Sequence, residues 1–420
     1  MILKDIYNMQ ERNWRQQYLI DVINQYNDKE VAIYGTGSHT EWLLSKLGSQ
    51  SRKLLALVDQ NSSYFGTLKF DLPIHSLEYV IEAGVKAIVI SSSFEQEIYG
   101  RIKHIENQGI KIIQLYSHEI LDTSSTFIVN RIKETCDGLN IHTFIDRRKR
   151  SEKLLVVLAG YKEYLWPFTL ERIAHYAPKD LDVCLTSSGL YSQKLADMAE
   201  RNNWSYLYTT LNEVSLTQNL AISNHPDAKW IYKMDEDIFI SNQYFENLLL
   251  GYQRIDQEGL YNPGFVAPLI NLNGYSYIYF LQMFGLDKEY KETFKELSHA
   301  ANGIKCHYSP EAARWIWKNS LPINKISRIV TEKPFSYSVI PHRFSIGAIL
   351  LKRDYWSKLG GFKVSVQEGM LGVDEEDLCR KCVEYSRVMC LVHNVFAGHF
   401  SFFPQEKAMK EFLNENQFSF

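Results

Sequence analysis

The stretch KWIYKMDEDIFIS, residues 229–241, runs from apolar residues through three consecutive carboxylates and back to apolar residues. The run before the acids predicts a buried strand. Successive side chains of an extended chain point to opposite faces, so Asp235 and Asp237 share one side and Glu236 points away. Two carboxylates are therefore expected to converge on one point at the end of a strand.

Strand and helix patterns alternate on both sides of this stretch. Upstream, apolar runs such as VAIY and LLALV alternate with amphipathic segments over residues 31–118, and the same alternation returns from residue 153. Such repetition predicts parallel sheets covered by helices on both faces, with right-handed crossovers. The predicted fold class is α/β throughout.

The length of 420 residues suits two domains, since domains typically hold about 100 to 200 residues. A small Rossmann-like domain is expected over residues 1–121. A connecting helix and a polar linker follow over residues 122–150, where the pattern loosens. A second α/β domain is expected over residues 151–420.

Beyond residue 262 the alternation weakens and aromatic residues concentrate. Tyr275, Tyr277 and Tyr279 recur with a period of two, which predicts one face of a strand. The alternative is that these rings form a platform for a sugar acceptor.

The composition is that of a soluble globular protein, with 45% hydrophobic and 23% charged residues. A net charge of -3 gives no reason to expect a nucleic-acid partner. No apolar stretch approaches the roughly 20 residues that span a bilayer, and the N-terminus is too polar for a signal peptide. A cytoplasmic location is expected; attachment to the inner face of the membrane and a homodimer remain open.

The three acids at 235–237 have two readings. Polar residues commonly follow strands, and helix starts favour negative charge. However, ligands of open α/β sheets bind beyond the carboxyl ends of the strands. Carboxylate oxygens suit Mg²⁺ or Mn²⁺, which normally takes one or two of them together with phosphate oxygens and water. This reading predicts a divalent cation and a diphosphate.

A second run of acids, Asp374, Glu375, Glu376 and Asp377, opens a predicted helix. Helix-start stabilisation and i,i+4 pairs with Arg380 and Lys381 could account for it. Four adjacent carboxylates also repel one another, which raises pKa values and suits a general base. The sequence leaves both readings open.

Residues 153–400 resemble nucleotide-sugar-dependent glycosyltransferases of the GT-A fold, of the inverting, family-two-like kind. In that family a D-x-D holds a metal on the donor diphosphate, which places Asp235 and Asp237 as ligands. A late histidine often adds a third ligand, here His399. The turn at 360–362 precedes the acidic motif, as in the family.

The resemblance does not fix the base. Aligning DEEDLCRK with the family's EDxDL form selects Glu375, and aligning it with a bare ED selects Glu376 and Asp377. The resemblance also implies a set of donor-binding residues on the early strands and on the triplet strand. These are Ala159, Gly160, Tyr161, Thr186, Ser187, Gln218, Asn219, Lys233, Asp235 and Glu236. The family often has an aspartate where Thr186 and Ser187 stand, so UDP and GDP both remain open.

The N-terminal domain resembles the Rossmann-like domains attached to bacterial nucleotide-sugar acetyltransferases. Gly35 and Gly37 follow a predicted strand, and Asp59 ends the next strand, as in a dinucleotide site. Thr40 stands at the third glycine position of that motif. A nucleotide site and a packing or dimerisation role are both consistent with these residues.

Taken together, the residues and the resemblance predict a metal-dependent glycosyltransferase. It would transfer a sugar from a nucleotide-sugar to a hydroxyl of a glycan or lipid-linked glycan, with inversion, in bacterial surface polysaccharide synthesis (capsule, O-antigen or lipooligosaccharide). One alternative is a sugar-phosphate nucleotidylyltransferase, although LAGYKEYLW at 158–166 lacks that class's Gly-rich basic loop. The other is a non-enzymatic scaffold with a degenerate transferase domain.

Overall fold

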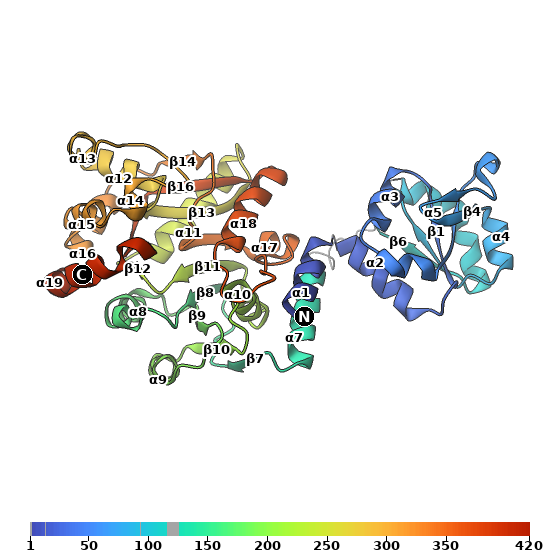
Figure 1. The fold of residues 1–420 in the computed structure, drawn as a ribbon, viewed down its shortest axis with the longest axis horizontal. Helices are drawn as coiled ribbons and strands as arrows, with labels where there is room; N and C mark the ends of the chain where they lie inside the picture. Colours follow the sequence, from blue (N-terminus) through green and yellow to red (C-terminus); the bar gives the residue numbers. More distant parts are fainter. Residues whose placement is uncertain (1, 13, 93, 116–125) are drawn as a thin grey trace. The chain divides into compact units, whose positions relative to one another are not determined.

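The protein is described by a computed structural model that covers residues 2–12, 14–92, 94–115 and 126–420. It divides into two compact units, Met1–Ile132 and Lys133–Phe420, each of mixed α/β structure (Figure 1). The boundary falls within helix α7 (Phe127–Gly138), inside the predicted linker, whose residues 122–125 lie outside the described part. In that described part, no helix combines the length and the apolar character needed to cross a membrane.

The first unit contains a six-stranded sheet in the order β3-β4-β2-β1-β5-β6. Its neighbours are parallel except for the antiparallel pair β3–β4. The strands are β1 (Val31–Tyr34), β2 (Leu54–Val58), β3 (Leu68–Lys69), β4 (Leu72–His75), β5 (Ala87–Ile90) and β6 (Lys111–Gln114). The helices are α1 (Ile2–Glu11), α2 (Trp14–Gln25), α3 (Ser38–Leu44), α4 (Leu77–Glu82) and α5 (Glu95–Ile102).

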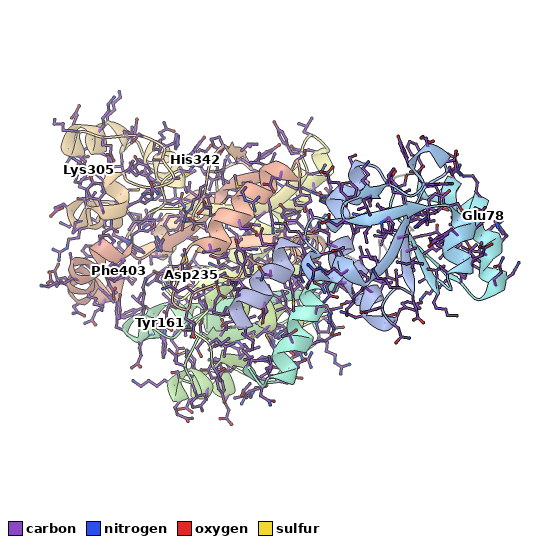
Figure 2. The ribbon with its side chains drawn as sticks, turned by 45° about the vertical axis from the view of Figure 1, so that its right-hand side comes forward. Glu78, Tyr161, Asp235, Lys305, His342 and Phe403 are labelled. Atoms are coloured by element: carbon purple, nitrogen blue, oxygen red, sulfur yellow. The ribbon has the colours of Figure 1, made fainter. Side chains whose placement is uncertain are left out.

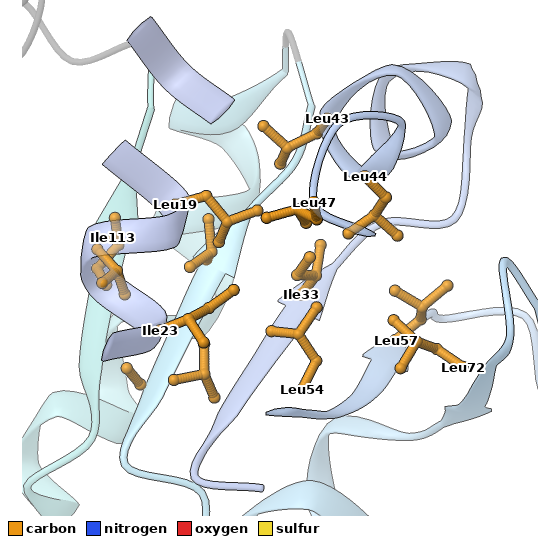
Figure 3. Packing of buried hydrophobic residues seen from close by; sticks show 14 of the residues in the cluster. Leu19, Ile23, Ile33, Leu43, Leu44, Leu47, Leu54, Leu57, Leu72 and Ile113 are labelled. Carbon is orange, nitrogen blue, oxygen red and sulfur yellow. The ribbon is translucent and has the colours of Figure 1, made fainter. Parts of the chain in front are cut away.

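Both faces of this sheet are buried. On one face Ile33 of β1 belongs to a cluster with Leu19 of α2 and Leu43 of α3 (Figure 3). Its neighbours on the strand, Ala32 and Tyr34, belong to a cluster on the opposite face. Each fully buried aliphatic side chain contributes about 1.5–3 kcal/mol relative to exposure. Burial on both faces explains why the strands read as continuous apolar runs instead of alternating patterns.

The second unit contains a ten-stranded sheet in the order β12-β16-β13-β15-β11-β8-β9-β10-β7, with β14 paired to β16. Strand β11 lies between β8, which is parallel to it, and β15, which is antiparallel. The strands are β7 (His142–Ile145), β8 (Lys153–Leu158), β9 (Asp182–Ser187), β10 (Ser205–Thr209), β11 (Trp230–Asp235), β12 (Ile238–Phe239), β13 (Pro263–Ile270), β14 (Tyr337–Ile340), β15 (Ala348–Lys352) and β16 (Val388–His399).

Two predictions about these segments need correction. Residues 142–145 were expected in a polar linker, but they form the edge strand β7, paired antiparallel with β10. An edge strand is stabilised mainly by pairing with its neighbour, so its own sequence indicates a strand only weakly. The period-two tyrosines do not form a strand, because Tyr277 and Tyr279 lie on helix α12 (Ser276–Met283). Tyr275 and Tyr279 are four residues apart, and their hydroxyls lie 3.0 Å from each other.

Helices cover this sheet and connect its strands (Figure 1). They are α8 (Trp166–Tyr176), α9 (Gln193–Arg201), α10 (Val214–Ser223), α11 (Tyr244–Glu258), α12 (Ser276–Met283), α13 (Asp287–Phe294), α14 (Lys305–Tyr308), α15 (Pro310–Lys318), α16 (Ile323–Thr331), α17 (Arg353–Lys358), α18 (Val373–Glu384) and α19 (Glu406–Asn416). The predicted stop after α17 is present, since Gly360 and Gly361 have φ of 75° and 84°. Helix α18 begins at the predicted second acidic run.

Candidate functional site

The triplet lies where β11 ends. Asp235 is the last residue of β11 and pairs in register with Leu158, the last residue of β8. The loops that follow the two strands therefore start side by side, and Figure 2 labels Tyr161 in the loop after β8 and Asp235 at the end of β11. The two outer acids do not share the same partners. Oδ1 of Asp235 accepts from Lys233 Nζ at 2.7 Å, whereas Asp237 faces Lys162 and His399.

Asp237 is the most strongly stabilised anion of the triplet. The residue is 3% exposed, and its Oδ2 lies 2.5 Å from Lys162 Nζ and 3.4 Å from His399 Nε2. Burial by itself would raise the pKa of Asp237. The ammonium of Lys162 and the imidazole of His399 outweigh burial and hold that pKa well below its usual range. Asp237 is therefore an ionised acceptor at neutral pH.

His399 is held in a fixed orientation. Its Nδ1 lies 3.0 Å from the carbonyl oxygen of Leu272. A carbonyl can only accept, so Nδ1 carries a proton and Nε2 is the nitrogen directed at Asp237. Metal-binding histidines are commonly oriented by such a second-shell hydrogen bond.

The predicted metal ligands are only partly assembled. Over residues 2–12, 14–92, 94–115 and 126–420, no three His, Cys, Asp or Glu side chains form a group that could hold a metal ion. Asp237 and His399 form a two-donor pair, while Asp235 is turned to Lys233. Mg²⁺ or Mn²⁺ usually takes few protein ligands and completes its shell with phosphate oxygens and water. The pair fits such a cation when a phosphate ligand accompanies it.

Glu236 has a different environment from its two neighbours. The residue is 7% exposed, and its carboxylate accepts four hydrogen bonds. The donors are the backbone N–H groups of Gly160, Tyr161 and Lys162, at 3.0–3.1 Å, and the indole N–H of Trp166 at 2.6 Å. A carboxylate offers about four lone-pair positions. No acceptor position is left for the donor contact that was predicted for Glu236.

The four acids at the start of α18 lie in different environments. Glu376 is 74% exposed, and Asp377 pairs with Arg380 and Lys381 of its own helix. Glu375 accepts a hydrogen bond from Arg343 Nε at 2.6 Å. Burial, and after it the negative charge of Asp374, raise the pKa of Glu375, although the contact with Arg343 lowers it. Asp374 is 7% exposed and makes no ion pair or side-chain hydrogen bond with any residue in the described part of the chain. Only the pair with Lys381 follows the predicted i,i+4 pattern.

The two acidic regions meet through a short piece of backbone before β15. Ile346 donates its N–H to Glu375 Oε2 at 3.3 Å, and the next residue, Gly347, accepts from the N–H of Asp235 at 2.8 Å. A side chain at Gly347 would lie 3.2 Å from Asp235 Oδ2. The two acidic regions are also coupled electrostatically. Desolvation is the main cause that raises the pKa of Asp235, and the carboxylates of Asp237 and Asp374 raise it further, whereas Lys233 lowers it.

The predicted residues on the early strands fall into two groups. Thr186, Ser187, Gln218 and Asn219 are at most 2% exposed, and their side chains bond to the protein. Asn219 accepts from Trp356 and Phe362 and donates to the carbonyl of Phe362, so it holds the Gly360–Phe362 turn. Its contact also requires glycine at 361, where a Cβ would lie 2.7 Å from Asn219 Oδ1.

The loop after β8 is the accessible part of the predicted donor site. Tyr161 is 57% exposed, and its hydroxyl donates to the carbonyl of Ser188 at 2.7 Å. Ala159 is buried and its N–H donates to Thr186. Gly160 has φ of 142°, a conformation that favours glycine. The ring of Tyr161 is thus available as a platform, while the backbone N–H groups of this loop are already used.

Three residues at the site were not predicted. Lys162, Trp166 and Arg343 contact Asp237, Glu236 and Glu375 respectively. Lys162 lies directly after the predicted residues 159–161, so a search for basic residues beyond strand ends would have found it. The sequence gives no comparable indication for Arg343, because this residue contacts Glu375 from a segment that is distant in the chain.

Glu213 is a buried carboxyl beside this site. It is 1% exposed, caps α10 by accepting from the N–H of Leu216, and accepts from the N–H of Ser365 at 2.9 Å. Desolvation is the main cause that raises its pKa from 4.5 to about 7, and the charge of Asp374 adds to it.

Between pH 4.5 and 7 the folded chain therefore binds more protons at Glu213 than the unfolded chain does. Stability should fall as pH rises through this window and stay level above it, by about 3 kcal/mol at most. Glu213→Gln is expected to remove this slope. Urea unfolding of the wild type, of Glu213→Gln and of the exposed control Glu200→Gln at pH 5 and pH 8 tests this. Equal pH slopes for all three proteins would contradict it.

In the first unit, the predicted dinucleotide residues are engaged in close packing and in hydrogen bonds within the protein. Gly35 has φ of 121°, and a Cβ there would lie 2.8 Å from the carbonyl oxygen of Ser91. Asp59 accepts from Thr36 Oγ1 at 2.5 Å and from the N–H of Asn61. Thr40 donates to the carbonyl of Gly35 or to Ser91 Oγ. The glycine is needed by close backbone packing, and nucleotide binding by this unit stays a prediction.

The sequence matches no protein-family profile and no curated protein. A mannosyltransferase from Pyrobaculum calidifontis, PcManGT, solved in complex with GDP-Man and Mn²⁺, is similar to it at 12% identity and a TM-score of 0.34. The similarity covers 66% of each chain, just under two thirds of the mannosyltransferase.

Proposed function

We propose that the chain is a nucleotide-sugar-dependent glycosyltransferase of the GT-A type that works with inversion on a carbohydrate hydroxyl. The observation that carries the proposal is the meeting of two acidic regions, around Asp235 and Asp374, through the Ile346–Gly347 backbone. One region offers an anion and an imidazole for a cation, and the other offers a carboxylate without a protein partner in the described residues. These are the parts that an inverting transfer requires.

In this proposal Asp237 and His399 hold a divalent cation, and Asp235 lies beside them. The cation supplies Lewis-acid stabilisation of the charge that develops on the leaving diphosphate. The exposed ring of Tyr161 lies against the nucleoside, since it is the accessible aromatic residue of the loop after β8. The resemblance extends the proposal to UDP- or GDP-linked donors and to glycan or lipid-linked glycan acceptors of a bacterial surface polysaccharide.

Asp374 is the general base in this proposal. It takes the proton from the acceptor hydroxyl as that oxygen attacks the anomeric carbon and the bond to the diphosphate breaks. Glu375, Glu376 and Asp377 are less suited to the role. Glu375 is bound to Arg343, Glu376 is largely exposed, and Asp377 faces two basic residues of its own helix.

The test is sugar transfer and donor hydrolysis from a panel of UDP- and GDP-sugars with Mn²⁺, in the wild type and in Asp237→Asn. Loss of a cation contact worth several kcal/mol should lower the rate about 100-fold. Mn²⁺ binding, followed by electron paramagnetic resonance in the presence of UDP or GDP, should weaken in parallel. The matched control is Asp180→Asn, whose carboxylate also pairs with a lysine at 2.5 Å but at the other end of β8. Pyrophosphorolysis of the donor without transfer would instead identify a nucleotidylyltransferase.

A further inference from the structure

We infer that Lys162 binds the diphosphate of the donor and that Glu236 is the positioning residue that places Lys162 there. The inference rests on the proposed function, and it assigns new roles to two residues of the same site. Glu236 then contributes to donor binding without touching the donor.

The first step concerns the loop that carries Lys162. Three consecutive backbone N–H groups, of residues 160, 161 and 162, converge on the single carboxylate of Glu236. Such a concave run of N–H groups is an anion-binding arrangement. Here a side chain of the protein is the anion. The loop is thereby fixed to the strand end that carries the triplet, and its N–H groups are not free for a phosphate.

The second step concerns the direction of the Lys162 side chain. From this fixed backbone, its ammonium reaches Asp237 Oδ2 at 2.5 Å and lies within electrostatic reach of Asp235 and Glu236. An ammonium has three N–H donors. Asp237 is its only side-chain hydrogen-bond partner among the residues that the structure describes, which leaves donors for a ligand.

The third step compares Lys162 with the other cations of the site. Lys233 is 4% exposed and bonds to Asp235, and Arg343 is paired with Glu375 and Glu376. The Lys162 side chain remains 25% exposed at the edge of the triplet. A phosphate approaching this acidic region needs a cation that it can touch, and lysine is a common point-charge partner for phosphate. Of the two lysines at the triplet, Lys162 is the one with both free donors and access, whereas Arg343, 36% exposed, belongs to the second acidic region.

The experiment measures equilibrium binding by calorimetry, in buffer containing Mn²⁺, of UDP, GDP, uridine and guanosine to the full chain. Lys162→Met should weaken binding of the nucleoside diphosphate about 10- to 100-fold, as expected for loss of a charged hydrogen bond. Binding of the nucleoside should change less than about threefold, because the base and ribose are not contacted by Lys162. Lys162→Arg should retain most of the diphosphate affinity.

The matched control is Lys153→Met at the opposite end of β8. Lys153 pairs with Asp180 at the same 2.5 Å, and its side chain is 24% exposed. It should bind all four ligands as the wild type does. Circular dichroism of each variant establishes that it is folded, and a folded Lys162→Met protein with wild-type diphosphate affinity would overturn the inference.

The role of Glu236 is tested by a double-mutant cycle with Glu236→Gln. If Glu236 acts by placing Lys162, the loss caused by Lys162→Met should be at least about threefold smaller in the Glu236→Gln background. Additive losses overturn the positioning role. If wild-type protein binds neither UDP nor GDP, the proposed function fails together with the inference. If it binds and transfers but Lys162→Met is unaffected, the inference alone fails.

Discussion

Asp374→Asn is expected to lower kcat for sugar transfer by about 10³-fold, within the range for loss of a general base. An asparagine keeps the size of the side chain but cannot accept the acceptor's proton. Among the acids at the start of α18, Asp374 is the one that is buried, free of ion pairs in the described structure and electrostatically coupled to Asp235. The effect should fall on kcat with little change in KM for the donor, since Asp374 does not bind the diphosphate in the proposed site.

Asp377→Asn is the matched control, because Asp377 sits one helical turn further on and its charge is neutralised by Arg380 and Lys381. Its kcat should stay within about threefold of the wild type, because it takes no part in the chemistry. A thousandfold loss in Asp377→Asn or Glu375→Gln, with Asp374→Asn near wild type, would move the base to that residue. Wild-type rates in all three variants would exclude these three residues as the base.

Glu236→Ala is expected to destabilise the second unit by about 4 kcal/mol. The substitution removes the acceptor of four N–H donors, and each buried donor left unsatisfied costs about 1–3 kcal/mol. The total is reduced because Tyr161 is exposed, so part of the loop can bond to water instead. Trp166, 3% exposed, has no such route, and its indole N–H should carry much of the cost.

Urea unfolding followed by far-ultraviolet circular dichroism measures this loss. The control is Glu163→Ala in the same segment, whose side chain is 56% exposed and pairs with an exposed lysine. It should cost less than about 1 kcal/mol, as surface ion pairs do. If Glu236→Ala and Glu163→Ala unfold at the same urea concentration, Glu236 does not hold the loop.

The sequence predicted the regular elements near the site well. Runs such as residues 31–34 and 230–235 are buried strands, and the acids at 374–377 open a helix, as their patterns indicate. These features depend on neighbours in the chain, and hydrophobic periodicity reports them directly. The exceptions, β7 and α12, are segments whose conformation is decided by their packing partners.

The sequence by itself determined which residue types stand at the element ends: the triplet at 235–237 and His399 where strands end, and the four acids at 374–377 where a helix begins. Only the tertiary structure decided what each of them does, because hydrogen bonds and ion pairs join residues far apart in the chain. Glu236 accepts hydrogen bonds from the loop at 160–162, and Asp377 pairs with a lysine of its own helix. Asn219 accepts a hydrogen bond from the turn at 360–362. Asp237 meets His399, and Asp235 is linked to Glu375 by hydrogen bonds to two successive residues: Gly347, whose carbonyl accepts from the N–H of Asp235, and Ile346, whose N–H donates to the Glu375 side chain. The pKa of an ionisable group depends on its partners and on its burial, and sequence spacing determines neither.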